Sequence, residues 1–179
     1  MGAKIWTDVA ISNDGSKIFG CTENAGVFYS SNGGTTDTLI SPVITFYGIS
    51  LSGDESTLIA SSSTNNKLYV WNGINASTAN YTSEITLTGI TRDWRTTACS
   101  NNATFMMAGD WNNVSGNGGI FMSYNSGSTW NKNTSTNSPF DKRIFYLNCT
   151  SDGYTIVAVS WGIPNASNTL DYLYLGKYI

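Results

Sequence analysis

The segment Ser123-Tyr-Asn-Ser-Gly-Ser-Thr-Trp130 places the turn-forming residues Ser, Asn and Gly directly before a large aromatic side chain. An earlier segment, Ser30-Ser-Asn-Gly-Gly-Thr-Thr36, has the same Ser-x-Asn-x-Gly-x-Thr spacing and continues into Asp37 instead of a tryptophan. Asn side chains accept hydrogen bonds from nearby backbone N–H groups, and glycine supplies the positive φ that sharp corners need. Both segments therefore predict the same structural corner, and their recurrence indicates an internal repeat.

The repeat extends well beyond these two corners. In four places a short apolar strand reaches a hydrophobic residue or Cys, then Ser or Thr, then a turn rich in Asn, Asp and Gly, and a second and a third apolar strand follow. The equivalent first-strand positions are Ile11, Leu51, Cys99 and Cys149, which are 40, 48 and 50 residues apart. This period is close to that of a four-stranded β-propeller blade.

The composition also favours an all-β fold. Charged residues make up only 12% of the chain, while the turn formers Asn, Ser and Gly and the strand formers Thr, Tyr, Val and Ile are abundant. No stretch shows the apolar spacing of a helix. We expect a single small propeller domain over 1–179, whose repeats cover about 4–41, 42–88, 89–138 and 139–179.

The two corners resemble the Asp-box, or BNR repeat, of the propeller superfamily that includes sialidases and sortilin. The box residues are Ser30, Asn32, Gly34, Thr36, Ser123, Asn125, Gly127, Thr129 and Trp130. The resemblance implies that these residues stabilise the hairpin between strands three and four, on the face away from any ligand. The second repeat has Trp71-Asn-Gly-Ile-Asn and the fourth Leu175-Gly-Lys-Tyr at this point, and neither is a box.

The fourth repeat reaches only its third strand, so the last blade is expected to be incomplete. Three arrangements fit this pattern: a four-bladed ring with an open or three-stranded last blade, a piece of a larger propeller, or one part of an oligomeric ring. A closed ring usually completes its last blade with a strand from the other terminus.

Several kinds of site are excluded or disfavoured by the residue content. The formal charge is −3 and the nine basic residues are scattered, so no cationic surface for nucleic acid is expected. No apolar run approaches the length of a membrane span. The chain has no histidine, which excludes Cys/His zinc sites and Ser-His-Asp catalysis, and we expect no metal and no cofactor. Cys21, Cys99 and Cys149 are expected to be small hydrophobic residues of the core.

Catalysis is not expected either. A sialidase uses three convergent arginines, a Tyr-Glu nucleophile pair and an Asp acid/base; Arg92, Arg95 and Arg143 are present, but none of the three glutamates lies beside a plausible nucleophilic tyrosine. General glycoside hydrolysis needs two carboxylates across a cleft. Carboxylates could gather at one face, but no spacing selects a pair among Glu23, Asp93, Asp110 and Asp141.

The candidate ligand site lies in the loops after the second strands. Trp111 and Trp161 occupy equivalent positions at the start of the long loops of repeats three and four. A tryptophan beside amides and carboxylates can stack on the C–H face of a sugar while the polar groups hold its hydroxyls. The predicted ligand residues are Trp111, Trp161, Asp110, Asn112, Asn113, Glu23 and Arg143. The competing interpretation is that both tryptophans fold inward and fill the space between blades.

These observations predict a non-catalytic recognition or adhesion module with glycans as the candidate ligand. The alternative is a purely structural or assembly protein that acts through protein–protein contacts, as a homo-oligomer or in a larger assembly, and a sialidase-like hydrolase comes third. An extracellular or virion-surface location is favoured over a cytoplasmic one.

Overall fold

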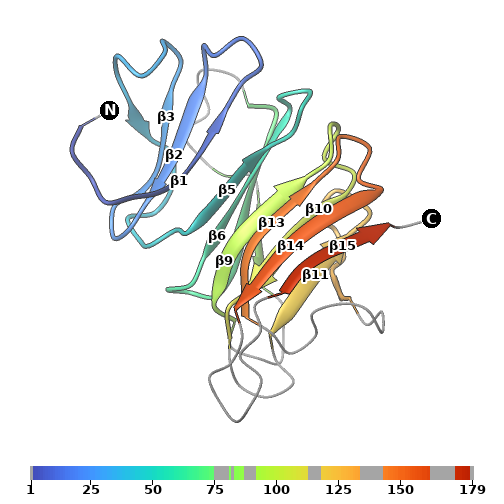
Figure 1. Ribbon diagram of the computed structural model, residues 1–179. Helices are drawn as coiled ribbons and strands as arrows, with labels where there is room; N and C mark the ends of the chain where they lie inside the picture. Colours follow the sequence, from blue (N-terminus) through green and yellow to red (C-terminus); the bar gives the residue numbers. More distant parts are fainter. Residues whose placement is uncertain are drawn as a thin grey trace.

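A computed structural model describes residues 2–74, 81, 83–86, 92–112, 118–133, 143–161 and 172–177. All regular structure in these residues is β-strand, arranged in four antiparallel sheets, which confirms the all-β prediction (Figure 1). In these ranges, no helix is long and apolar enough to cross a membrane.

Each sheet, called a blade below, uses strands that are consecutive in the chain. The first blade contains β1 (Trp6–Ile11), β2 (Ile18–Thr22), β3 (Gly26–Ser30) and β4 (Thr38–Leu39). The second contains β5 (Gly48–Leu51), β6 (Thr57–Ser62), β7 (Lys67–Asn72) and β8 (Ser83–Thr86). The third contains β9 (Trp94–Cys99), β10 (Met106–Asp110), β11 (Gly119–Ser123) and β12 (Asn131–Lys132). The fourth contains three described strands, β13 (Arg143–Cys149), β14 (Thr155–Trp161) and β15 (Tyr172–Lys177).

The blades stack in chain order. The first strands pack successively, β1 on β5, β5 on β9 and β9 on β13, and together they line a central hollow of about 260 Å³. The first and fourth blades lie at opposite sides of this row, as do the two chain ends (Figure 1). The first strands are therefore the inner strands of a blade arrangement around an axis, as the period of the repeat predicts.

The pleat of each strand gives every blade two different faces. The face turned to the following blade is called forward here, and the face turned to the preceding blade is called backward. On the second strands, Phe19, Ile59 and Met107 point forward and are fully buried, whereas Leu58, Met106 and Ile156 point backward and are fully buried. Because successive side chains alternate between faces, near-continuous apolar stretches such as Leu58–Ala60 arise where both faces of a blade meet a neighbour.

A small residue recurs on the backward face of each second strand, opposite an aromatic residue of the third. The pairs are Gly20–Phe28, Ala60–Tyr69, Ala108–Phe121 and Ala158–Tyr174. From the sequence pattern, the third strands are expected to align at Val27, Leu68, Ile120 and Tyr172. The register corrects the last of these: the equivalent residue of the fourth repeat is Leu173. The shift was hidden because Tyr and Leu alternate through this strand and both suit a buried face.

The turns between first and second strands are built alike in all four blades. In the first, Ser12 Oγ donates to Asp14 Oδ1 at 2.7 Å, and the Ser16 N–H donates to the same oxygen at 2.9 Å. The same bonds centre on Asp54, Asn102 and Asp152 in the other blades. The hydroxyl bonds contribute most to lowering the pKa of Asp14 to about 2, and they lower the pKa values of Asp54 and Asp152 in the same way.

The two box segments have the same pattern of hydrogen bonds, each within its own corner. In the third blade, Asn125 Oδ1 accepts from Ser123 Oγ at 3.0 Å and from the Thr129 N–H at 2.8 Å, while its Nδ2 donates to Thr129 Oγ1 at 2.9 Å. Ser123 Oγ in turn accepts from the N–H of Gly127, which has a φ of 84°. Equivalent bonds join Ser30, Asn32, Gly34 and Thr36. The box residues thus stabilise their own corners, with Trp130 closing the second one through a bond to the Gly127 carbonyl.

All three cysteines are free thiols, one fully buried and two half-buried. Burial raises the pKa of Cys21 and Cys99 to about 12 and that of Cys149 to about 11. Such thiols carry little reactive thiolate near neutral pH.

Candidate functional site

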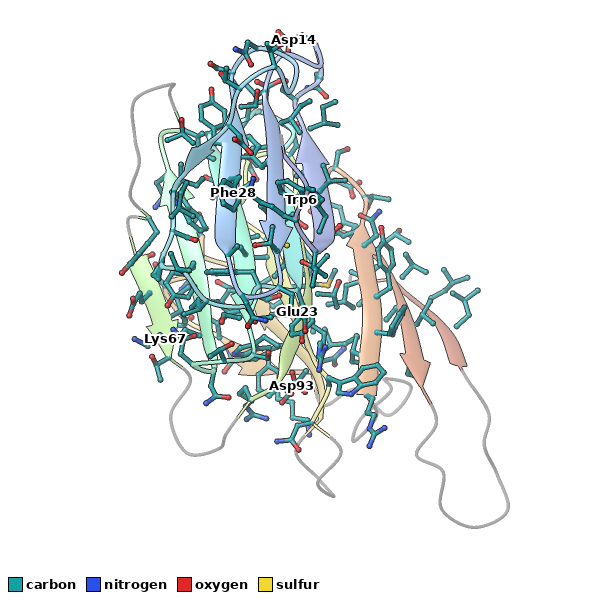
Figure 2. All side chains as sticks on the ribbon, turned by 90° about the vertical axis from the view of Figure 1, so that its left-hand side faces the viewer. Trp6, Asp14, Glu23, Phe28, Lys67 and Asp93 are labelled. Atoms are coloured by element: carbon teal, nitrogen blue, oxygen red, sulfur yellow. The ribbon has the colours of Figure 1, made fainter. Side chains whose placement is uncertain are left out.

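The two ends of the blades have different structures. One end, called the turn end, carries the turns after the first strands and both box segments; backbone bonds join them, from Gly33 N–H to Ser16 O and from Ser126 N–H to Thr104 O. The other end, called the loop end, carries the connections after the second strands and between blades. Figure 2 shows Asp14 at the turn end, with Glu23, Lys67 and Asp93 toward the loop end. The box segments therefore lie at the end opposite Trp111.

A buried ion pair organises the loop end of the third blade. Asp110, fully buried at the end of β10, lies 3.1 Å from Nη1 of the buried Arg92. Its Oδ1 also accepts the N–H groups of Asp93 and Asn112, each at 2.9 Å. Burial raises the pKa of Asp110, while these donors act in the opposite direction. The carboxylate therefore fixes the backbone next to Trp111. The backbone N–H of Trp111 itself donates to the Asp93 carbonyl oxygen at 2.8 Å.

Trp111 is half-buried among aromatic and cationic side chains. The guanidinium carbons of Arg95 and Arg143 lie 5.6 and 5.5 Å from the centre of the indole ring, within the range of cation–π contacts. The ring of Phe145 lies 5.7 Å away between centroids, tilted by 57°. The indole is thus held in place by side chains from β9 and β13.

Arg95 is held by a carboxylate and by a second aromatic ring. Its Nε and Nη2 atoms donate to the two carboxylate oxygens of Asp93 at 2.9 and 3.3 Å, and its Cζ lies 3.8 Å from the centre of the Tyr47 ring. A guanidinium held by a bidentate bond and a ring face presents its remaining N–H groups in a fixed direction.

Two hollows meet at this cluster. One, of about 340 Å³, is lined by Thr7, Asp8, Tyr47, Arg95, Thr96, Trp111, Phe145 and Tyr146. The other, of about 490 Å³, is lined by Ser63, Asn66, Arg92, Asp93, Arg95, Trp111, Asn112 and Arg143. The first combines aromatic rings with a few polar groups, the second is mostly polar and charged, and Trp111 and Arg95 belong to both.

Comparison with solved structures identifies the architecture. The chain superposes on Kuenenia stuttgartiensis hydrazine synthase with a TM-score of 0.72 and 12% identity, covering 99% of this chain and 47% of that one. It superposes on an ancestral GH74 enzyme, itself a propeller, with a TM-score of 0.65 and 18% identity, covering 96% of this chain and 24% of that one. The fold is a small β-propeller. This chain spans less than half of either matched chain, and no family model and no curated protein matches its sequence.

The propeller places the predicted ligand residues in different situations. Trp111, Asn112 and Arg143 line the larger hollow. Asp110 lies directly beneath them but is enclosed by its ion pair, so it positions the site. Glu23 is half-buried at the loop end of the first blade and lines neither hollow. Asn113 lies outside the described residues, and Trp161 is described only in its backbone, as the last residue of β14.

Arg95, Asp93 and Tyr47 were not among the predicted ligand residues, although they shape the site. Each lies at or just before the loop end of a first strand, as Arg143 does. The signal in the sequence was therefore available: polar and aromatic residues that open the inner strands converge on the axis of a propeller. No group of three or more acidic or cysteine side chains that could hold a metal occurs within the described ranges.

Proposed function

We propose that this propeller is a non-catalytic recognition module that binds carbohydrate at its loop end through Trp111. The observation that carries the proposal is the half-buried indole, which lies beside the guanidinium groups of Arg95 and Arg143 and is shared by two hollows. An aromatic ring beside fixed polar groups suits a sugar, since the ring takes the C–H face and the polar groups take the hydroxyls.

The polar groups around the indole support this choice of ligand. Asn66, Ser63 and Asn112 line the larger hollow together with Asp93 and the arginines. Neutral amides and hydroxyls offer both donors and acceptors, which matches the hydroxyl groups of a saccharide. The N–H groups of Arg95 that Asp93 does not engage add directional donors.

The proposal of a binding role rather than hydrolysis rests on the carboxylates. Asp110 is buried and surrounded by three donors, and Asp93 forms a bidentate pair with Arg95. A general acid or nucleophile must reach the glycosidic bond, and a pair of such groups must face each other across it. Both carboxylates instead have structural partners. Asp8, the carboxylate of the smaller hollow, accepts the backbone N–H groups of Val9 and Ile49 at 2.8 and 3.0 Å.

The test is binding to a defined glycan array, followed by calorimetry with the best-binding oligosaccharide. Trp111→Ala should weaken binding by about tenfold or more, the loss expected for removing a stacking aromatic anchor. Arg143→Ala should weaken it as well. Tyr154→Ala, which truncates an exposed aromatic at the turn end, is the matched control and should bind like the wild type. Equal binding by Trp111→Ala and wild type would refute the site.

An assembly role is the second candidate. It is favoured by apolar side chains that lie exposed on the first and last blades, among them Val9, Ile11, Leu173 and Leu175.

A further inference from the structure

The forward face of the fourth blade is apolar and exposed. On β15, Leu173 and Leu175 are 68% and 71% exposed. Their equivalents in the three other blades are buried against the following blade: Val27, Leu68 and Ile120 for the first position, and Tyr29, Val70 and Met122 for the second. Val157 and Val159 pair with the two leucines on the same face. The fourth blade thus has the side chains of a buried face without a following blade among the described residues.

The backward face of the first blade shows the same mismatch. On β1, Val9 and Ile11 are 64% and 60% exposed. The equivalents of Val9 are Ile49, Thr97 and Leu147, all buried against the preceding blade. Trp6 and Phe28 lie side by side on this face (Figure 2). The indole of Trp6 covers Gly20, where an added Cβ would be 2.6 Å from the ring.

The exposed face of the fourth blade and that of the first blade are the two kinds of face that pack together elsewhere in the chain. Every interface inside the chain joins the forward face of one blade to the backward face of the next, and this joint occurs three times. The backward side carries a small residue opposite an aromatic, Gly20 opposite Phe28 in the first blade. The forward side carries larger apolar residues: Phe19 and Tyr29 in the first blade, and aliphatic residues or methionine in the others. Among the described residues, the forward face of the fourth blade and the backward face of the first have no neighbouring blade, and together they match the two sides of a joint already formed three times.

We propose that a second copy of this chain occupies both faces, so that two chains close one eight-bladed ring. Repeat arrays present polar faces to solvent, so these two apolar faces are expected to be covered by a partner. The contact is head-to-tail, and such contacts close into a ring only when the rotation per chain divides a full turn. Closed propellers typically have four to eight blades, and two copies of a four-bladed unit reach eight.

The ring makes a specific prediction about the ligand sites, although it does not depend on them. A twofold axis along the propeller axis keeps the loop ends of both chains on the same side. The two Trp111 clusters would then face one surface together, and a ligand with several sugar units could engage both.

Sedimentation equilibrium and light scattering measure the mass directly. The wild-type chain should have twice the 19.3 kDa mass of one chain at micromolar concentration. Leu175→Glu and Val9→Lys should each be monomeric, because each charges one side of every joint. Tyr154→Glu is the matched control, because Tyr154 is about as exposed as Val9 and Leu175 but lies at the turn end, in a hollow shared with Phe105 and Tyr124. This variant introduces the same negative charge and should remain dimeric.

Mixing the two monomeric variants separates this arrangement from a symmetric face-to-face dimer. In the mixture one joint has only unchanged residues, and the other brings opposite charges into one interface, so the double-mass species should return. Circular dichroism of each variant checks that the blades remain folded; an unfolded variant is replaced by Leu173→Glu or Ile11→Lys. A wild-type chain that stays monomeric up to about 100 μM overturns the proposal. A wild-type chain that forms filaments, or whose mass is a multiple of the single chain other than two, also overturns it. The same holds if Leu175→Glu or Val9→Lys remains dimeric, or if the mixture of the two variants does not form a dimer.

Discussion

The hydrogen-bond network of the box segments allows a stability prediction with a built-in replicate. Asn125→Ala removes three bonds at once: those that Oδ1 accepts from Ser123 Oγ and the Thr129 N–H, and the one that Nδ2 donates to Thr129 Oγ1. Asn32→Ala removes the equivalent three bonds in the first blade. Because the networks match, the two substitutions should cost similar amounts of stability.

The magnitude follows from the exposure of the corner. A net intramolecular hydrogen bond contributes about 0.5–1.5 kcal/mol, and water replaces part of each lost bond when the side chain is exposed, as Asn125 is. We therefore expect Asn125→Ala to lower the free energy of unfolding by about 1–2 kcal/mol. In a chain of this size that corresponds to a fall in Tm of roughly 2–8 °C.

Urea unfolding and calorimetry at one fixed protein concentration give both quantities. Asn125→Asp keeps the acceptor oxygens and should stay close to wild type. Ser128→Ala changes a neighbouring exposed residue of the same corner and serves as the control. If Asn125→Ala and Asn32→Ala unfold within about 0.3 kcal/mol of wild type, the corners are not stabilised as the geometry indicates.

Three further predictions concern other parts of the propeller. An added Cβ at Gly48 would lie 2.6 Å from Thr96 Cα and 2.9 Å from the Arg95 carbonyl oxygen. Gly48→Ala should therefore lower the free energy of unfolding in urea by about 1–3 kcal/mol. An unchanged urea midpoint would contradict the close packing of β5 on β9. Asp110→Ala removes the carboxylate that pairs with the buried Arg92 and should lower the free energy of unfolding by about 3–5 kcal/mol. The double variant Asp110→Ala with Arg92→Met should lose less stability than the sum of the two single variants. Strictly additive losses would show that the two side chains are not coupled. The carboxylates of Asp14, Asp54 and Asp152 have lowered pKa values, so the stability that they contribute is present above their ordinary pKa, near pH 4, and is lost as the pH falls toward 2. Replacing all three with Asn should make the Tm depend less on pH in that range. A fall in Tm as steep as that of the wild type would locate the acid sensitivity elsewhere.

Much of the architecture could be predicted because the determinants of each blade are local. The spacing of Ile11, Leu51, Cys99 and Cys149 gave the period, and the Ser/Thr-x-Asp/Asn turns gave the ends of the first strands. An incomplete last blade was also predicted, and the described residues of the fourth blade form three strands. The register of β15 was not, because an alternating Tyr-Leu strand reads equally well when shifted by one residue.

The site was harder to predict than the fold because it depends on contacts between blades. The position of Trp111 at the loop end followed from topology, but its neighbours Arg95, Phe145 and Tyr47 come from three different blades. A single sequence does not reveal which side chains meet across such distances. The sequence also does not indicate that Arg92 encloses Asp110, because one residue precedes β9 and the other ends β10 and only the fold brings them together.

The indole N–H signals of the chain's six tryptophans provide the most direct test that recognition occurs at the loop end. They can be followed by NMR during titration with the best-binding oligosaccharide and assigned by single Trp→Phe substitutions. We expect the signal of Trp111 to shift, while those of Trp130 at the turn end and of the buried Trp71 stay in place. A shift of Trp130 with Trp111 unchanged would place the ligand at the turn end and refute recognition at the loop end.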